Sequence, residues 1–369
     1  MNILHLLSQA EVTGAETYAA TLANDQVRQG HAVTVVSDTF RTPTQATFIA
    51  QPISNRRYGQ RLRNVLFLRK FIRQNRIDLV HAHSRAASWV SYFARLGTNV
   101  PLVATVHGRQ HLHASVRSLD IYGDRVITVC EDLKTHLVRE VKMDAAKVTV
   151  IPNGVDFSAI NPRTVPSRME NSANINRVLS LVGRTSGPKG ERTGQVIRQA
   201  LRPLLQTFPD LNVHVVGGAP EKLGPAVLAE IESLNRDFEN RIHCPGFITP
   251  LPAHLAASGL IVASGRVAID ALWLGKPLLA FGESQYHGLV TSENLAAAVA
   301  SNFGDVLPTL PVPEPDYARI GRDIHGFFTG RPPLFSARKT VEQRYDIRKV
   351  ADAVMDVYHS ARSKKQRGR

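Results

Sequence analysis

The sequence predicts an α/β protein of two doubly wound domains, each with a mostly parallel sheet covered by helices on both faces. Three observations lead to this fold class. The chain has 369 residues, more than one hydrophobic core usually serves. Short apolar runs rich in β-branched residues alternate with helix-length spacers along most of it. The alternation breaks once, in the polar segment 157–176, which has two prolines and no apolar periodicity.

These boundaries define the expected domains. We expect a first domain over 1–156, a linker over 157–176, a second domain over 177–336, and a returning helix plus basic tail over 337–369. The expected strands of the first domain lie in 2–8, 31–37, 78–84, 101–108, 125–130 and 147–156, and those of the second in 177–184, 212–218, 241–246, 259–264 and 277–282. The apolar positions of the last helical pattern are Val341, Tyr345, Ile347, Val350, Val354 and Val357.

Composition places the chain among globular proteins, since 43% of its residues are hydrophobic and 21% are charged. No apolar run reaches the ~18–20 residues that span a bilayer. The start, "MNILHLLSQAEVTGAE", has no basic lead and no cleavage site, so we interpret it as a first strand and not a signal peptide. Cys130 and Cys244 lie in apolar runs, which favours buried thiols in a reducing, cytoplasmic compartment.

Positive charge is concentrated in two places within a formal net charge of +14. Segment 55–76 holds eight Lys and Arg and no acid, and segment 362–369 holds five more. Because the rest is nearly balanced and the tail lacks aromatic residues, no nucleic-acid partner is expected. The pattern of segment 55–76 predicts an amphipathic helix. Its basic face either contacts an anionic membrane or is the solvated side of a sheet-covering helix.

Ligands of doubly wound sheets bind where the carboxyl ends of strands lead into helices. After the first strand, Thr13 can cap a helix, Gly14 permits close backbone approach and Glu16 falls in the first turn. An anion site and a plain capping turn are equal alternatives there. In the second domain, "LVGRTSGPKG" places Arg184 and Lys189 on a loop that opens a helix. These cations suit a diphosphate, and the alternative is a solvated basic loop.

Histidines follow two expected strands of the first domain. His107 ends "VATVH", where it either faces a ligand or is a core histidine. His81 and His83 are two apart on a strand and therefore share a face. No third metal ligand is suggested, so we interpret them as a structural or substrate-contacting pair and assign no metal site.

The stretch "ASGRVAIDALWLGKPLLAFGE" is expected to form a strand end, a turn, a helix and a further strand. Ser264 or Gly265 caps the helix, so that its first amides point toward a ligand. Arg266 falls in the first turn and Asp270 one turn further on.

With these residues in view, the chain resembles the retaining nucleotide-sugar glycosyltransferases of the GT-B fold, the family 4-like or "group 1" enzymes. The resemblance covers nearly the whole chain, and its specific part is the ordered series of motifs together with "IPNGVD". It implies an α/β architecture of two Rossmann-like domains facing a central cleft, with the C-terminal helix crossing back to the first domain. The motifs are "TGAE", "HAHS", "TVHG", "VCEDLKTHL", "KVTVIPNGVDFSAINP", "VGRTSGPKG", "CPGFIT" and "IDALWLGKPLLA".

The resemblance also implies roles for individual residues. Arg184 and Lys189 would hold the donor diphosphate and offset charge on the leaving nucleotide, without a metal. His107 would contact the transferred sugar, and these three are the predicted catalytic residues. Asp270 would grip the ribose. The other predicted donor contacts are Gly14, Gly217, Phe247, Ile248, Ser264, Gly265 and Arg266, and the predicted acceptor contacts are Glu16 and His83.

One family feature is altered. The family carries two glutamates eight positions apart, and this chain has Val262 and Asp270. Valine cannot accept a hydrogen bond from a sugar hydroxyl, and aspartate is one methylene shorter than glutamate. A serine-glycine turn followed by an acid serves the donor in the related inverting branch. We expect this donor-binding motif to be active but to contact the sugar differently. In it, the backbone amides of Gly265 and Arg266 contact the donor.

The implied function is transfer of a sugar from a UDP- or GDP-linked donor to a glycan or lipid-linked acceptor. We expect the transfer to retain the anomeric configuration and to need no cofactor beyond the co-substrate. We also expect a role in cell-surface polysaccharide or lipopolysaccharide-type synthesis at the cytoplasmic face of the inner membrane. The acceptor is expected at the loops 39–59 and 108–119. A sugar-nucleotide epimerase on the same fold and a non-catalytic relative stay open as alternatives.

Overall fold

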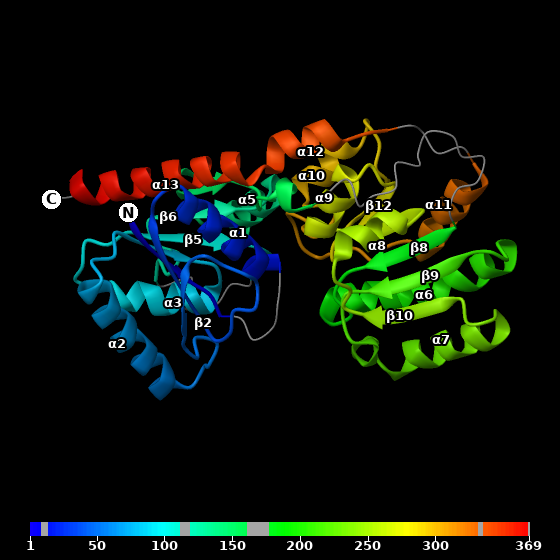
Figure 1. Cartoon of the computed structure of the whole chain (residues 1–369), viewed down its shortest axis with the longest axis horizontal. Helices are drawn as coiled ribbons and strands as arrows, with labels where there is room; N and C mark the ends of the chain where they lie inside the picture. Colours follow the sequence, from blue (N-terminus) through cyan, green and yellow to red (C-terminus); the bar gives the residue numbers. More distant parts are fainter. Residues whose placement is uncertain (9–13, 111–118, 161–176, 331–334, 368–369) are drawn as a thin grey trace. The chain divides into compact units, whose positions relative to one another are not determined.

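The computed structural model describes residues 1–8, 14–110, 119–160, 177–330 and 335–367, and the chain forms two compact units (Figure 1). Unit 1 comprises Met1–Phe157 and Arg344–Arg369, and unit 2 comprises Ser158–Gln343. The chain thus returns to unit 1 at Arg344, seven residues after the expected boundary at 337. Most of the expected linker, 161–176, lies outside the described residues.

Unit 1 has a seven-stranded, fully parallel sheet of order β3-β2-β1-β4-β5-β6-β7. All six strands expected for this domain are present. The sequence missed β3, a mostly exposed edge strand inside the segment 39–59 that we expected to be a loop. The strands are β1 Asn2–Leu6, β2 Ala32–Ser37, β3 Thr47–Ala50, β4 Leu79–Ala82, β5 Leu102–Val106, β6 Arg125–Thr128 and β7 Val148–Val150.

Helices cover both faces of this sheet because the inner strands are apolar on both sides. The core on one face joins strand residues to α1 and α13, and the core on the other joins them to α2 and α3. The helices of unit 1 are α1 Gly14–Arg28, α2 Tyr58–Gln74, α3 Arg85–Ala94, α5 Glu131–Arg139 and α13 Ile347–Arg367.

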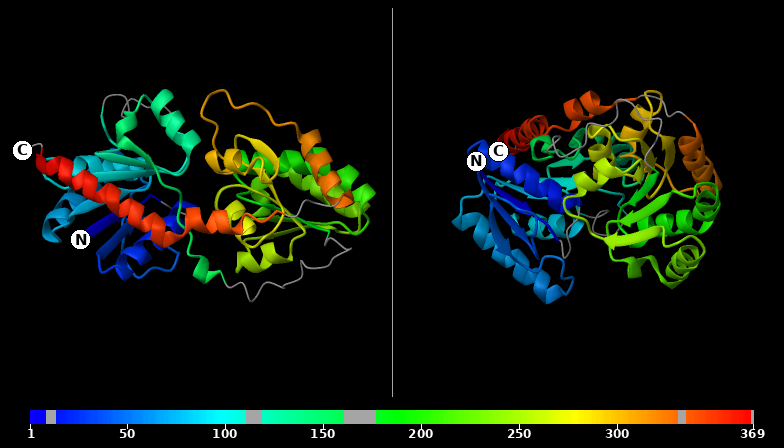
Figure 2. Two further views of the ribbon diagram at one scale, coloured as in Figure 1. Left: turned by 90° about the horizontal axis from the view of Figure 1, so that it is seen from above. Right: turned by 45° about the vertical axis from the view of Figure 1, so that its right-hand side comes forward.

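From Arg344 on, the last helical segment packs on unit 1, as predicted. Figure 2 shows α13 lying along this unit, and the six predicted apolar positions are all buried. The segment is two helices, since α12 ends at Tyr345 and α13 begins at Ile347. Between them, Val155 N–H donates to the Tyr345 carbonyl at 2.7 Å and Ile347 N–H donates to the Val155 carbonyl at 3.0 Å. These bonds fasten the returning chain to the end of "IPNGV".

Unit 2 has a six-stranded sheet of order β10-β9-β8-β11-β12-β13. All five expected strands are present and parallel, and the missed strand β13 is antiparallel to β12. The strands are β8 Val178–Val182, β9 Asn212–Val216, β10 Ile242–Gly246, β11 Leu260–Ala263, β12 Leu278–Phe281 and β13 Tyr286–Leu289. The helices are α6 Gly187–Thr207, α7 Pro225–Asp237, α8 Leu251–Ala257, α9 Gly265–Trp273, α10 Leu295–Ala300, α11 Tyr317–Thr329 and α12 Arg338–Tyr345, the last of which ends in unit 1.

Two further expectations concern the cysteines and the absence of long apolar runs. Cys130 is buried and Cys244 is half-buried, and neither is part of a disulfide. Among the described residues, no helix combines the length and hydropathy needed to cross a bilayer.

Candidate active site

The predicted donor residues of unit 2 gather at the carboxyl edge of its sheet. Arg184 follows β8, Ser264 follows β11 and Glu283 follows β12, and these three strands are neighbours. The loops after them therefore meet at one edge, as the doubly wound fold requires. Of these residues, Arg184 and Ser264 were predicted and Glu283 was not.

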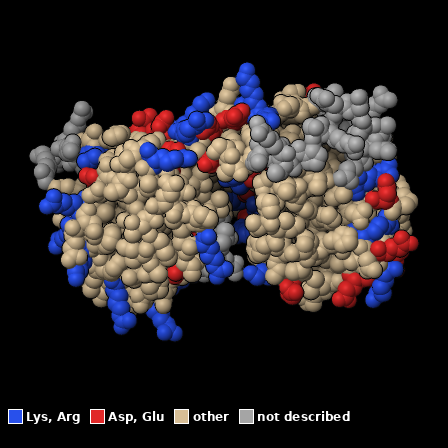
Figure 3. Space-filling model, in the orientation of Figure 1, with Lys and Arg blue, Asp and Glu red and all other residues tan. Residues whose placement is uncertain are grey.

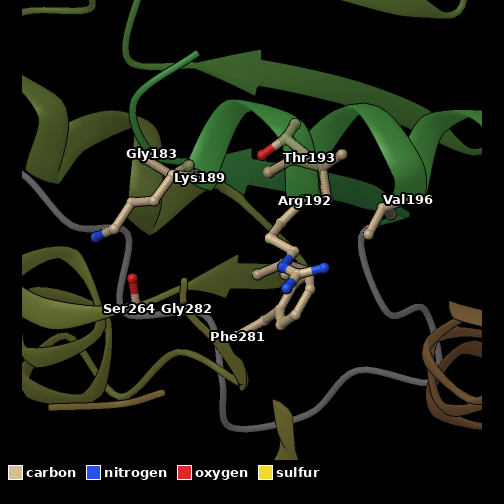
Figure 4. Close-up of a pocket in the computed structure, with 11 residues that line it drawn as sticks. Gly183, Lys189, Arg192, Thr193, Val196, Ser264, Phe281 and Gly282 are labelled. Carbon is tan, nitrogen blue, oxygen red and sulfur yellow. The ribbon is translucent and has the colours of Figure 1, made fainter. Parts of the chain in front are cut away.

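A small pocket with a volume of about 30 Å³ lies at this edge (Figure 4). Gly183 lines it from just after β8, Lys189 from the first turn of α6, and Ser264 from the start of α9. Arg192 and Phe281 line it as well. Two predicted residues, Lys189 and Ser264, are thus brought to one cavity from parts of the sequence about 75 residues apart.

Each of the two predicted diphosphate-binding cations is paired with a carboxylate of unit 2. The Arg184 guanidinium lies 2.8 Å from Glu283 Oε1, and Lys189 Nζ lies 2.9 Å from Asp305 Oδ1. Arg184 is more than half exposed, whereas Lys189 and Asp305 are largely covered. The Arg184 guanidinium is therefore open to an incoming anion, whereas the Lys189–Asp305 pair is mostly shielded from solvent.

Glycines set the backbone of the loop that carries these cations. A Cβ at Gly190 would lie 2.1 Å from the carbonyl oxygen of Thr185, so only glycine fits in this first turn of α6. Gly217 has a φ of +116°, and a Cβ there would lie 2.4 Å from the Gly183 carbonyl oxygen. Gly217, predicted as a donor contact, thus packs against the backbone of Gly183, which lines the pocket. This close packing leaves no room for a side chain at Gly217.

The start of α9 shows the structure of the altered donor-binding motif. Ser264 is the N-cap residue, but its side chain makes no capping hydrogen bond. Gly265 adopts a left-handed φ of +55°, and its N–H donates to the Asn302 carbonyl at 3.1 Å. The predicted contact between this amide and the donor would require that bond to be exchanged.

Asp270 is buried and paired within its own helix. Arg266 Nε donates to Asp270 Oδ1 at 2.8 Å, one turn away. Burial raises the pKa of Asp270, and the Arg266 guanidinium opposes that shift. The predicted contact of Asp270 with the ribose stays a prediction, and in this structure Arg266 holds its carboxylate.

The predicted base-binding residues lie after the edge strand β10. Phe247 is 74% exposed and Ile248 is half-buried. A large exposed aromatic ring next to Gly246, whose φ is +77°, is available for stacking on a planar ligand.

In unit 1, His107 and His83 lie side by side at the carboxyl ends of β5 and β4. Their ring centroids are 5.9 Å apart at an interplanar angle of 22°, and the Tyr18 ring meets both edge-on. Burial lowers the pKa of His107 to about 4, and Asn153 opposes the shift in part. His107 is therefore neutral near pH 7.

Gly14, the predicted phosphate contact, is the first residue of α1, and a Cβ added to it would meet open space. Thr13, the predicted cap of this helix, lies outside the described residues.

A third histidine that the sequence did not suggest joins His81 and His83. His5 on β1 pairs in register with His81, and the possible ligand atoms of the three lie within 4.8 Å of one another. His5 Nδ1 and His83 Nε2 are 2.8 Å apart, closer than the roughly 3.3 Å between two nitrogens that share a tetrahedral zinc ion. The spacing fits a direct hydrogen bond better than a metal centre.

The directions of these hydrogen bonds follow from the Gln26 amide, whose oxygen can only accept. His5 Nε2 donates to this oxygen at 2.7 Å, so His5 Nδ1 accepts from His83 Nε2. The Gln26 amide nitrogen donates to the Tyr358 hydroxyl at 3.3 Å, which in turn donates to His81 Nδ1 at 2.6 Å. His81 Nε2 completes the chain by donating to Thr105 at 2.7 Å. Neutral histidines in one proton arrangement account for all of these hydrogen bonds, and His83 Nδ1 has no partner among the described residues.

Glu16 corrects a prediction. It was expected at the acceptor, but it is fully buried, and its Oε1 accepts from Arg41 N–H, Thr42 N–H and the Thr42 hydroxyl at 2.8, 2.8 and 3.0 Å. These bonds fasten the loop after β2 to α1. The structure therefore gives Glu16 a structural role. The segment 111–118 of the other expected acceptor loop lies outside the described residues.

Comparisons with known proteins agree with this architecture. The profile of Glycosyltransferase Family 4 matches residues 12–159. The chain is 26% identical over 246 residues to the UDP-Gal:alpha-D-GlcNAc-diphosphoundecaprenol alpha-1,3-galactosyltransferase of Escherichia coli, covering 62% of this chain and 60% of that protein. The chain thus spans less than two thirds of the length of this curated relative.

Solved structures are similar over nearly the whole of this chain. A glycosyltransferase from Rickettsia africae aligns with a TM-score of 0.74 at 19% identity, over 98% of its own chain. Anabaena HepE in complex with UDP and glucose aligns with a TM-score of 0.72 at 18% identity, over 100% of its chain. A UDP-GlcNAc 2-epimerase from Neisseria meningitidis is more distant, with a TM-score of 0.61 at 15% identity, 98% of this chain and 100% of that one.

The fold is thus the two-domain GT-B fold, which confirms the expected fold class. Residues 12–159 match the profile of Glycosyltransferase Family 4, and the Escherichia coli relative and the Rickettsia africae structure are both named as glycosyltransferases.

Proposed function

We propose that this protein transfers a sugar from a nucleotide-diphosphate donor to a glycan or lipid-linked acceptor. The observation that carries the proposal is the pair of cations, Arg184 and Lys189, held at the carboxyl edge of the unit 2 sheet beside a pocket. The Escherichia coli relative is named for a UDP-galactose donor and a diphosphoundecaprenol-linked acceptor, which supports this substrate class.

In the proposed reaction, the bond from the sugar's anomeric carbon to the terminal phosphate oxygen breaks. A bond from the acceptor hydroxyl oxygen to that carbon forms, and the hydroxyl proton moves to the departing phosphate. Arg184 and Lys189 offset the charge that builds on the leaving nucleotide, so we propose that the step needs no divalent metal. For His107 and Gly14, contacts with the sugar and the phosphate stay predictions. Retention and a role in surface-polysaccharide synthesis on the cytoplasmic side are part of the proposal.

Calorimetry with UDP, GDP and their hexose conjugates tests the donor site. We expect at least one nucleotide to bind wild type, and Arg184→Ala and Lys189→Ala each to weaken binding about 10-fold or more. Asp210→Asn is the matched control, because it alters an ion pair with Arg177 next to the amino end of β9. Normal nucleotide affinity in both alanine variants would remove the clamp assignment.

Product analysis separates transfer from the alternative chemistry. NMR of the donor incubated without acceptor should show no new sugar epimer, and its appearance would favour the epimerase. With a lipid-diphosphate-linked sugar as acceptor, the coupling constant of the new anomeric proton reports retention or inversion. Unchanged turnover in EDTA is expected for a metal-independent step.

A second proposal is that the outer face of α2 contacts an anionic membrane. One face of this helix buries Asn64, Leu68 and Ile72 against unit 1. The other face exposes Tyr58, Leu62 and Leu66 by 87%, 60% and 57%. Lys and Arg side chains stand over this part of unit 1 (Figure 3). An apolar row among cations on one helix suits an interfacial contact, with each cation near the surface adding about 1 kcal/mol.

Vesicle sedimentation tests this second proposal. We expect binding to vesicles that contain phosphatidylglycerol, little binding to pure phosphatidylcholine, and a loss of binding in Leu62→Ser/Leu66→Ser. Leu96→Ser changes another exposed leucine of unit 1, 44% exposed, and should leave binding intact. Equal sedimentation with both lipids at low salt would contradict the proposal.

A further inference from the structure

We propose that Asp305 supplies the donor-sugar contact that the chain lacks at Val262, by accepting a hydrogen bond from a hydroxyl of the transferred sugar. The inference rests on the proposed function, since it concerns the same donor site. It would make Asp305 a residue that determines affinity for the sugar and not for the nucleotide.

Val262 itself cannot serve this purpose. It lies inside β11, is 5% exposed and packs in the unit 2 core. Val262 does line the pocket, but its side chain is apolar and cannot accept a hydrogen bond from a sugar hydroxyl. A carboxylate at the edge of β11 would therefore have to come from another part of the chain.

Asp305 reaches that edge from a different part of the chain. Its Oδ2 lies so near the start of α9 that a Cβ added to Gly265 would be 2.9 Å away. Its carboxylate also touches Lys189, with Nζ 2.9 Å from Oδ1 and 3.0 Å from Oδ2. Asp305 thus stands between the first turn of α9 and the cation predicted to bind the diphosphate.

The backbone around Asp305 is held in place. Gly304 has a φ of +93°, and its carbonyl accepts from the N–H groups of Ser284 and Gln285, both at 2.9 Å. A Cβ at Gly282 would lie 2.3 Å from the carbonyl carbon of Gly304, so the two segments meet backbone to backbone. The Ser284 hydroxyl donates to the Asp305 carbonyl at 3.2 Å. A residue on so constrained a turn is suited to positioning a ligand.

The hydrogen bonds of the Asp305 carboxylate leave capacity for a ligand. Oδ2 accepts from Lys189 and from the Asn302 side-chain amide at 3.3 Å. Oδ1 is buried in ion contact with Lys189 but accepts no hydrogen bond from the described residues. A carboxylate offers about four acceptor positions, so a hydroxyl can be accommodated.

Donor binding would make the free acceptor positions of the Asp305 carboxylate accessible. We expect the flexible Lys189 side chain, one-fifth exposed, to turn toward the diphosphate and uncover the Asp305 oxygens. The sugar is bonded directly to the second phosphate, so its hydroxyls come next to the group that Lys189 has left. The rival explanation is that Asp305 is only a counter-ion for Lys189 in the empty site.

Paired calorimetric titrations distinguish the two explanations. The probes are UDP, UDP-glucose and UDP-galactose, with GDP and GDP-mannose as the second set, and the variants are Asp305→Asn and Asp305→Ala. If Asp305 grips the sugar, both variants weaken the tightest nucleotide sugar about 10- to 100-fold. The affinity for the free nucleoside diphosphate should stay within about threefold or rise, because a carboxylate beside the phosphates is lost.

Donor analogues that lack one sugar hydroxyl at a time sharpen the test. One deoxy analogue should bind wild type as weakly as the full donor binds Asp305→Asn, and the variant should not distinguish the two ligands. Thermal unfolding of each variant, with Asp210→Asn as a charge-matched control, shows whether the fold is kept.

The outcomes separate this inference from the proposed function. Equal changes for nucleotide and nucleotide sugar, or no change, would overturn the role of Asp305 and leave the donor site standing. Wild-type protein that binds no nucleoside diphosphate in either set would remove the proposed function and this inference with it.

Discussion

The Tyr358 hydroxyl donates to His81 Nδ1 at 2.6 Å and so joins the last helix of the chain to the centre of the unit 1 sheet. Both side chains are fully buried, and 277 residues separate them in the sequence. Burial raises the pKa of Tyr358 well above its ordinary value, so the phenol keeps its proton. Unit 1 is thus completed by a segment that the chain supplies after finishing unit 2.

Removing this hydroxyl should destabilise unit 1. In Tyr358→Phe, His81 Nδ1 and the Gln26 amide lose a buried partner, and we expect the free energy of unfolding to fall by about 1–3 kcal/mol. Tyr58→Phe is the control, because Tyr58 is 87% exposed. Denaturant unfolding followed by hydrogen exchange in unit 1 measures the difference. Equal stability of the two variants would mean that the bond contributes nothing.

The buried histidines make the stability of unit 1 depend on pH. Burial lowers the pKa of His5 and His107 from 6.5 to about 4, and it lowers those of His81 and His83 as well. Between these values the unfolded chain binds more protons than the folded one. The free energy of unfolding should therefore fall as the pH drops from about 6.5 to about 4, by roughly 3 kcal/mol for His5 alone.

Denaturant unfolding at several pH values from 7.5 to 4 tests this dependence, with hydrogen exchange assigning the loss to unit 1. The half-buried His214 of unit 2 serves as an internal comparison, since its pKa is lowered by burial as well but its side chain is partly exposed. A flat profile in unit 1 between pH 6.5 and 4 would contradict the neutral histidine chain.

Strands were predictable where their residues are buried on both faces. The run that forms β11 is apolar throughout, and all four of its residues are buried. The missed strand β3 is an edge strand with Thr47, Phe48 and Ala50 exposed, so it leaves no such pattern. The missed strand β13 contains Gly288 at a φ of +76° and runs antiparallel, which alternation of strands and helices does not suggest.

The site was predictable where a residue follows a strand directly. Arg184 and Ser264 met that condition, and the structure brings their loops to one sheet edge. Asp305 follows a helix and a turn, so only the folded backbone shows that it reaches Lys189. Glu16 was misplaced because its partners, the amides of Arg41 and Thr42, come from a loop whose path the sequence does not reveal.

The pairing of Arg266 with Asp270 yields a prediction for unit 2. Arg266→Leu leaves a buried carboxylate without its cation, and we expect a loss of about 1–3 kcal/mol, since Arg266 is partly exposed. Arg266→Leu/Asp270→Leu removes both charges and should recover most of that loss. Thermal unfolding measures the three proteins. A double variant less stable than the single one would show that Asp270 is held by more than Arg266.

Gly190 offers a prediction about the loop that carries the cations. In Gly190→Ala the new methyl group would meet the Thr185 carbonyl carbon and oxygen at 2.4 and 2.1 Å, and backbone atoms cannot give way as a flexible side chain can. We expect a loss of about 1–3 kcal/mol and weaker nucleotide binding, because Lys189 is displaced with the loop. Gly326→Ala is the matched control in helix α11, where a Cβ has open space, and it should be neutral or stabilise by up to about 1 kcal/mol. If Gly190→Ala kept wild-type stability and nucleotide affinity, the β8–α6 loop would be able to relax around the new methyl group. The tight turn at Gly190 would then not be needed to hold Arg184 and Lys189 at the sheet edge.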